Sequence, residues 1–173
     1  MSSLLKALNE NFGIEEFLMG VELFKDVPEK EQFITALSHV VEVKDFNKNE
    51  TIFEEGDGGE NLYILREGEV VVQKSNPDGQ VFNVIVLSSK EKPAIGEGGL
   101  IERSPRSATV RCRTQCSFVV LSRDKFNHFC EEHPKWGIAV YRSIFKIMVL
   151  RLRKMNTDLM LLHKALTNEI RGN

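Results

Sequence analysis

Residues 95–110 read IGEGGLIERSPRSATV, and they are the most informative stretch of the chain. The stretch begins with a glycine-rich bend, whose backbone can take positive φ angles and approach a ligand closely. We expect Leu100 and Ile101 to start a single helical turn, with free N–H groups and a positive dipole end near residues 98–100. The sequence therefore predicts a turn that binds an anion.

Two charged residues of this stretch carry the chemistry. Arg106 follows a proline and precedes a predicted strand, so its planar guanidinium could make two bonds to one phosphate. Glu97 is a poor neighbour for phosphate by charge, but its carboxylate would accept a hydrogen bond from a nearby hydroxyl, as a ribose offers. Taken alone, Arg106 would be a solvated strand arginine and Glu97 a surface glutamate. Together, beside a glycine bend, they favour a ligand-binding site.

Around this stretch the apolar residues recur at about every second position, which is typical of strands. From residue 41 onward, short apolar segments are separated by turn sequences such as Gly56-Asp57-Gly58-Gly59 and Asn76-Pro77-Asp78-Gly79. Further strands are predicted over 80–87, 108–114 and 116–121. About seven or eight short strands at this spacing indicate a sandwich or barrel.

Both ends of the chain show helical periodicity instead. An apolar stripe lies within residues 4–8 and a second within residues 33–40, with a break at 25–29 between them. Residues 124–170 are again helical, interrupted at His133-Pro134. We therefore expect helices on both sides of the strands.

The second C-terminal helix carries a heptad pattern, in which apolar residues advance by alternating steps of four and three. A helix that packs along its own barrel also has an apolar stripe, but usually a wider and less regular one. We therefore expect a homodimeric coiled coil over residues 141–166. The seam consists of Tyr141, Phe145, Met148, Leu152, Met155, Leu159, Leu162 and Leu166.

Composition narrows the possible classes of protein. The 173 residues are 42% hydrophobic and 28% charged, as in a soluble globular domain with a short appendage. No apolar run approaches the roughly 20 residues of a membrane span, and the N-terminus has no apolar signal core. Three cysteines fit reduced thiols in the cytoplasm. A net charge of -2 gives no general basicity for nucleic-acid binding.

The sequence contains no recognisable metal-binding or catalytic motif. Cys112 and Cys116 fall on different predicted strands, and no paired CxxC motif exists, so we expect no metal site. His39, His128 and His163 have no serine or aspartate in the context of a catalytic triad. We therefore expect a protein that is not an enzyme.

Residues 95–110 resemble the phosphate-binding cassette of the cyclic-nucleotide-binding domain family. Gly-Glu, two small residues, Leu and an aliphatic residue precede Pro-Arg, a small residue and Ala-Thr, and Glu97 and Arg106 have the family's spacing. Ile95 stands where an aromatic residue is usual. The resemblance extends over roughly residues 20–160. Its supporting segments are Leu23–Pro28, Ile52–Asp57, Leu62–Val70 and Phe126–Pro134.

The resemblance implies an eight-stranded β-roll, similar to a jelly roll or double-stranded β-helix, that encloses a cyclic purine nucleotide between flanking helices. By position, Glu97 would hold the ribose 2'-OH and Arg106 the cyclic phosphate. Ser107 would add a phosphate contact, and its place after the arginine favours cAMP over cGMP. The implied ligand-binding residues of the cassette are Gly96, Glu97, Gly98, Gly99, Arg106, Ser107 and Ala108.

In dimeric bacterial members of this family, polar residues of the long C-terminal helix cap the adenine. Asn156 flanks the seam and is the residue expected to do so here; otherwise it is a solvated helix asparagine. The same helix carries a basic stretch, which is usually a solvated face but could meet an acidic partner or the negative ligand. Its members are Arg142, Lys146, Arg151, Arg153 and Lys154.

We thus expect an N-terminal helical segment (1–40), a nucleotide-binding β-roll (41–122) and C-terminal helices (123–173). The function expected is that of a cytoplasmic sensor, in which the nucleotide acts through the dimer helix. The alternatives are a ligand-free roll that serves as a dimerising scaffold, or the sensor part of a longer transcription regulator. Residues 166–173 are too few for a DNA-reading module, so direct DNA binding is not expected.

Overall fold

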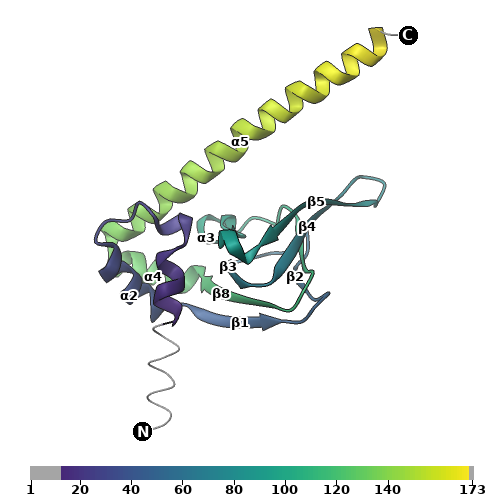
Figure 1. Ribbon diagram of the computed structural model, residues 1–173. Helices are drawn as coiled ribbons and strands as arrows, with labels where there is room; N and C mark the ends of the chain where they lie inside the picture. The colour runs from purple at the N-terminus through teal and green to yellow at the C-terminus, as the bar shows by residue number, and fades with distance from the viewer. Residues whose placement is uncertain (1–12, 172–173) are drawn as a thin grey trace.

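The computed structural model describes residues 13–171, with a strand-rich body between N-terminal and C-terminal helices (Figure 1). Residues 13–19 are helical, so the apolar stripe predicted within residues 4–8 lies outside the described residues. A 3-10 turn, η1 (Glu22–Phe24), and helix α2 (Lys30–Ser38) follow. After the strands come α4 (Arg123–Glu132) and α5 (Pro134–Arg171). No helix within the described range is both long and apolar enough to cross a membrane.

Eight strands form two four-stranded antiparallel sheets, in the orders β1-β8-β3-β6 and β2-β7-β4-β5, which confirms the predicted β-roll. A short 3-10 turn, η2 (Ser89–Glu91), leads into β6, and a four-residue helix, α3 (Gly98–Ile101), follows it. The strands are β1 (Glu42–Phe46), β2 (Thr51–Phe53), β3 (Asn61–Glu67), β4 (Glu69–Ser75), β5 (Val81–Ser88), β6 (Ala94–Ile95), β7 (Thr109–Cys112) and β8 (Cys116–Ser122).

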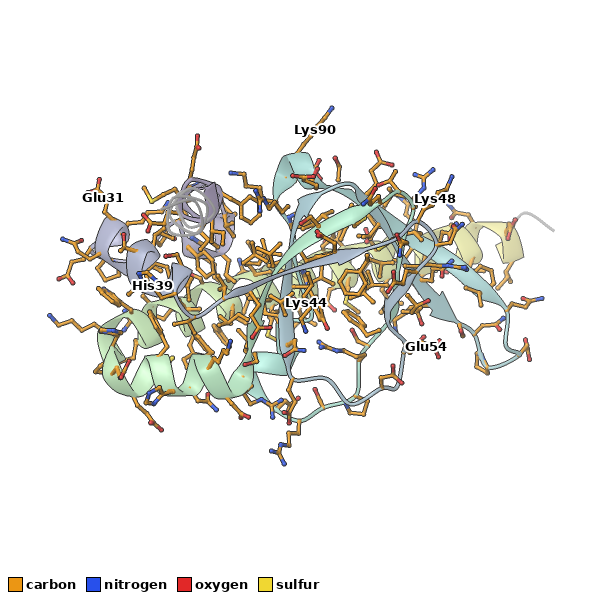
Figure 2. All side chains as sticks on the ribbon, turned by 90° about the horizontal axis from the view of Figure 1, so that it is seen from below. Glu31, His39, Lys44, Lys48, Glu54 and Lys90 are labelled. Atoms are coloured by element: carbon orange, nitrogen blue, oxygen red, sulfur yellow. The ribbon has the colours of Figure 1, made fainter. Side chains whose placement is uncertain are left out.

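Strand β3 is buried on both faces and separates two hydrophobic cores. Because successive side chains of a strand point to opposite faces, Leu62 and Ile64 pack among the helices, while Tyr63 and Leu65 pack between the two sheets. Strand β8 alternates in the same way. Charged side chains such as Glu31 and Lys90 point outward from the ribbon (Figure 2). The cores therefore hold the roll and the helices together through shared strands.

Helix α5 begins at Pro134, where the missing N–H of proline costs no helical hydrogen bond. Val140 and Ile144 are fully buried, and Ile147 packs against the helical core. Beyond this point α5 extends away from the body (Figure 1). From Phe145 onward, every residue of the predicted seam is at least 45% exposed. The seam therefore does not pack along the barrel of its own chain.

Strand β5 presents a second exposed apolar surface. It lies at the edge of its sheet, where it pairs with β4. The hairpin of these two strands extends from the body towards the same side as α5 (Figure 1). The exposed apolar side chains of β5 are Val81, Phe82, Val84, Ile85 and Val86.

Two glycines with similar positive φ angles allow a matched test of the fold. Gly68, between β3 and β4, has φ +91°, and an added Cβ would lie 2.3 Å from the carbonyl oxygen of Gln115. Gly79 has φ +81° with open space around it. We expect Gly79→Ala to cost about 1–2 kcal/mol of unfolding free energy, and Gly68→Ala about 1–3 kcal/mol more because its Cβ meets backbone. Urea denaturation measures both, and equal losses would contradict the close approach.

Candidate functional site

The glycine bend and the short helix predicted from residues 95–110 are both present, but the helix starts earlier than predicted. Gly96 has φ +76°, and α3 begins at Gly98 rather than at Leu100. The amide of Gly99 donates to the carbonyl of Gly96 at 2.9 Å, and that of Leu100 to the carbonyl of Glu97 at 3.1 Å. The expectation of free N–H groups over residues 98–100 is therefore wrong for two of the three. Within the described chain, the Gly98 amide donates to no carbonyl.

Arg106 is a buried residue, only 7% exposed, and not a solvated strand arginine. Its Nη1 donates to the carbonyl of Gly96 at 3.0 Å and its Nη2 to the carbonyl of Asn61 at 2.9 Å. The guanidinium carbon lies 4.3 Å from the centre of the Phe53 ring. These contacts fix the guanidinium between the bend, the start of β3 and the end of β2.

Three glycines make room for this guanidinium. A Cβ added at Gly59 would lie 1.9 Å from the Arg106 Nε, and one added at Gly96 would lie 2.3 Å from its Nη1. At Gly99, an added Cβ would lie 2.9 Å from the carbonyl oxygen of Gly59 and 3.1 Å from the Arg106 Nη1. The sequence identified Gly96 and Gly99 as site residues but placed Gly59 only in a turn. Gly98, in contrast, has open space where its side chain would be.

The Nε of this guanidinium has no hydrogen-bond partner. Among residues 13–171, the Arg106 Nε is the buried side-chain nitrogen or oxygen that makes no hydrogen bond. Burial lowers the pKa of the Arg106 guanidinium, whereas the nearby Glu97 carboxylate raises it. An unpaired buried donor is costly, and a negatively charged acceptor would relieve that cost. The site therefore fits an anion.

Glu97 immediately precedes α3, and its side chain is 12% exposed. Its Oε1 forms an ion pair with the Nη1 of Arg151, which comes from α5. A second member of the basic stretch, Lys146, pairs with Asp26 at 3.2 Å. Two members of the basic stretch thus form ion pairs within the chain, whereas its contact with an acidic partner or with the ligand stays a prediction.

The other predicted site residues lie in different surroundings. Ser107 is exposed next to Arg106, and Ala108 is buried immediately before β7. Asn156 is exposed on α5, five residues beyond Arg151. Within the described chain its side chain makes no hydrogen bond, so this structure of a single chain does not bring it to the cassette.

Arg123, which the sequence analysis did not single out, holds the backbone of the cassette through hydrogen bonds. It is 8% exposed and donates from Nε to the carbonyl of Gly99 at 2.8 Å and from Nη2 to the carbonyl of Glu102 at 2.5 Å. Its Nη1 lies 3.4 Å from a carboxylate oxygen of Glu60. Its main partners are backbone carbonyls distant in sequence, so no local motif could have revealed it.

The three cysteines of the chain are free thiols. Cys112 and Cys116 are buried, and burial raises the pKa of Cys112 to about 12 and that of Cys130 to about 11. Protonated thiols are poor metal ligands and nucleophiles. Over residues 13–171, no group of three or more histidine, cysteine and acidic side chains is arranged to hold a metal ion.

Comparison with known proteins places this chain in a family. The model of the cyclic nucleotide-binding domain matches residues 43–133. The "CRP-like cAMP-activated global transcriptional regulator" of Mycobacterium tuberculosis is 25% identical over 146 residues, which cover 84% of this chain and 62% of the regulator. The "cAMP-dependent protein kinase regulatory subunit" of Dictyostelium discoideum is 32% identical over 117 residues, 67% of this chain and 35% of the subunit. The chain thus spans less than two thirds of the length of these relatives.

A solved structure is similar as well. The regulatory domain of Toxoplasma gondii PKA, in a co-crystal structure with cAMP, is 30% identical and has a TM-score of 0.61. The match covers 69% of this chain and 44% of that one.

The role of Arg123 can be tested against a neighbour that shares its acidic partner. Arg103 also pairs with Glu60, at 2.9 Å, but its side chain is 81% exposed. Arg123→Ala removes the donors to the carbonyls of Gly99 and Glu102, and we expect a loss of about 2–3 kcal/mol of unfolding free energy. Arg103→Ala should cost about 0–1 kcal/mol, as exposed pairs do. Chemical denaturation compares the two variants, and similar losses would show that Arg123 does not support the cassette.

Proposed function

The chain belongs to the cyclic nucleotide-binding domain family, and from this we propose that it is a regulatory module that binds cAMP, with cGMP as a weaker ligand. The observation that carries the proposal is the buried guanidinium of Arg106, which has an unpaired Nε and lies within the electrostatic reach of Glu97. The relatives support the choice of nucleotide, because the Mycobacterium and Dictyostelium proteins are both named for cAMP.

Each residue of the cassette then has a separate role. Arg106 would bind the cyclic phosphate and Glu97 the ribose 2'-OH. The amide of Gly98 is open to the ligand, whereas that of Gly99 already donates to Gly96, so Gly99 contributes the absence of a side chain. Ser107 is exposed beside Arg106, in keeping with a further phosphate contact.

The unit that holds the nucleotide is proposed to be residues 41–122, with the helices of 123–173 as the responding part. The response would be a change in the arrangement of α5 relative to the roll, with no reaction catalysed by the chain itself. Asn156 would cap the purine in the pocket of either subunit. The free thiols fit a reducing compartment, which supports a cytoplasmic location.

A second copy of the chain is the proposed partner of α5. The seam from Phe145 to Leu166 is exposed along its whole length, and a row of apolar residues at heptad spacing is what a coiled coil buries. The hairpin of β4 and β5, which carries the exposed apolar residues of β5, extends towards the same side as α5 (Figure 1). A homodimer through residues 141–166 would bury the seam.

Removing the phosphate-binding group should weaken nucleotide binding. Charge-assisted hydrogen bonds contribute roughly 1.5–3 kcal/mol each, so Arg106→Ala should weaken cAMP binding at least about tenfold. Arg106→Lys keeps the charge but loses the fork and should fall in between. Isothermal titration calorimetry with cAMP and cGMP measures this, with Arg103→Ala as the exposed control. Unchanged affinity in Arg106→Ala would refute the phosphate assignment, and a parent that binds neither nucleotide would favour the scaffold.

The ribose assignment has its own test. Glu97→Gln removes the charge that accepts from the 2'-OH, so it should weaken cAMP binding more than binding of 2'-deoxy-cAMP. In that variant, loss of the 2'-OH should cost little further, because one interaction cannot be lost twice. Calorimetry with both nucleotides on parent and variant gives the comparison. A full additional loss would mean that another residue binds the hydroxyl.

The dimer and its coupling to the ligand are tested at the centre of the seam. Leu159→Asp would bury a charge without a partner, which costs several kcal/mol, and should give monomers. Leu161→Asp, also exposed but outside the seam, should leave the dimer intact. Sedimentation of both variants and the parent, with and without cAMP, measures the dimer constant. A monomeric parent would contradict the coiled coil, and a constant unaffected by cAMP would contradict the coupling.

A further inference from the structure

A groove of about 330 Å³ lies between α5 and the segment that joins η1 to α2. This volume is within the range of sites that hold a ligand or part of a partner. Asp26 and Pro28 line one side, and none of the lining residues belongs to the cassette. The other side is a single face of α5, because its residues follow at helical spacings. They are Lys135, Ile138, Ala139, Arg142, Ser143 and Lys146.

The groove carries more positive than negative charge. Its one acidic residue, Asp26, pairs with Lys146 at 3.2 Å, and both side chains are exposed, so this pair is weak. Within residues 13–171, the side chains of Lys135 and Arg142 form no hydrogen bond or ion pair. The first turn of α5 carries Lys135 and no acidic residue, although the start of a helix is already the positive end of its dipole. A negatively charged partner would compensate these charges.

The spacing of the cations indicates the shape of that partner. Lys135 and Lys146 are eleven residues apart on one helix, which corresponds to about 16 Å. A single phosphate ion cannot span this distance, whereas about five residues of an extended peptide can. Ile138 lies between the cations and is 55% exposed, so it offers an apolar contact. A net charge of -2 for the whole chain does not favour a nucleic acid.

We propose that this groove binds an extended acidic peptide segment of a partner protein. Carboxylates of the segment pair with Lys135 and Arg142, the half-buried hydroxyl of Ser143 donates to a further carboxylate, and an apolar side chain rests on Ile138. The groove and the seam are different faces of α5, because Lys146 follows the seam residue Phe145 by about 100° around the helix. The proposal therefore requires neither the nucleotide nor the dimer.

The test measures binding of a fluorescein-labelled peptide to the full chain by fluorescence anisotropy. The peptide has about eight residues, glutamates on both sides of a central leucine, which is enough to span the groove. Arg142→Glu replaces attraction by repulsion and should weaken binding at least about tenfold. Arg153→Glu changes the net charge equally, on the same helix but outside the groove, and should change the affinity less than about twofold.

Two further variants test the acidic and the apolar side of the groove. Asp26→Asn removes the carboxylate that competes for Lys146, so it should tighten binding of the peptide about threefold. Ile138→Ser should weaken binding about threefold, whereas Leu161→Ser, also an exposed apolar residue of α5, should have no effect. These variants change opposite sides of one groove, so their opposite effects would place the peptide between them.

Other results would overturn the proposal. A parent chain that does not bind the peptide, or equal losses in Arg142→Glu and Arg153→Glu, would show that the groove is not a peptide site. Weaker binding in Asp26→Asn would place the peptide elsewhere. If single-stranded RNA or phosphatidylserine vesicles bind through Arg142 and the peptide does not, the groove would recognise a nucleic acid or a membrane surface instead. Binding of cAMP is not measured in this experiment, so its outcome is independent of the proposed function.

Discussion

The cassette is organised around one buried guanidinium. Removing a cation from water is costly unless hydrogen bonds and neighbouring charges compensate, and Arg106 receives its compensation from two backbone carbonyls and the face of Phe53. Those contacts leave its Nε without a partner. The polypeptide thus stabilises the guanidinium in place while leaving part of its hydrogen-bonding capacity unused, which under the proposed function an anion would take up.

The buried guanidinium also constrains the residues around it. Carbonyls can reach the guanidinium only if nothing larger than hydrogen projects at Gly59 and Gly96. The positive φ of Gly96 turns its own carbonyl towards Arg106, and Arg123 holds the far end of α3 through Gly99 and Glu102. The sheets contribute in turn, because β3 supplies the carbonyl of Asn61 from a strand that both cores hold fixed.

Local features of the site could be predicted from the sequence, while contacts between distant segments could not. The glycine bend and the spacing of Glu97 and Arg106 lie within one short stretch, and the alternation of apolar residues in β3 and β8 depends only on strand geometry. Gly59 looked like a turn residue because its role depends on a guanidinium 47 positions away. Arg151 belonged to a recognisable basic stretch, but which of its members faces the cassette is decided by how α5 packs. The start of α3 was misplaced because glycines, which are poor helix formers, begin it.

Helix α5 combines two stripes that are related by a shift of one residue, or about 100° around the helix. One stripe consists of Val140, Ile144 and Ile147, packs on the body and ends at Arg151; the other is the exposed seam. A helix that spans both cannot rotate about its axis at the cassette without also turning the seam, because its hydrogen-bonded backbone transmits rotation along its length. A change of a fraction of a turn at Arg151 would therefore alter which side chains face a second copy. Under the proposed function, this rigidity links a small displacement of one carboxylate to the geometry of the assembly, and no second mobile element is required.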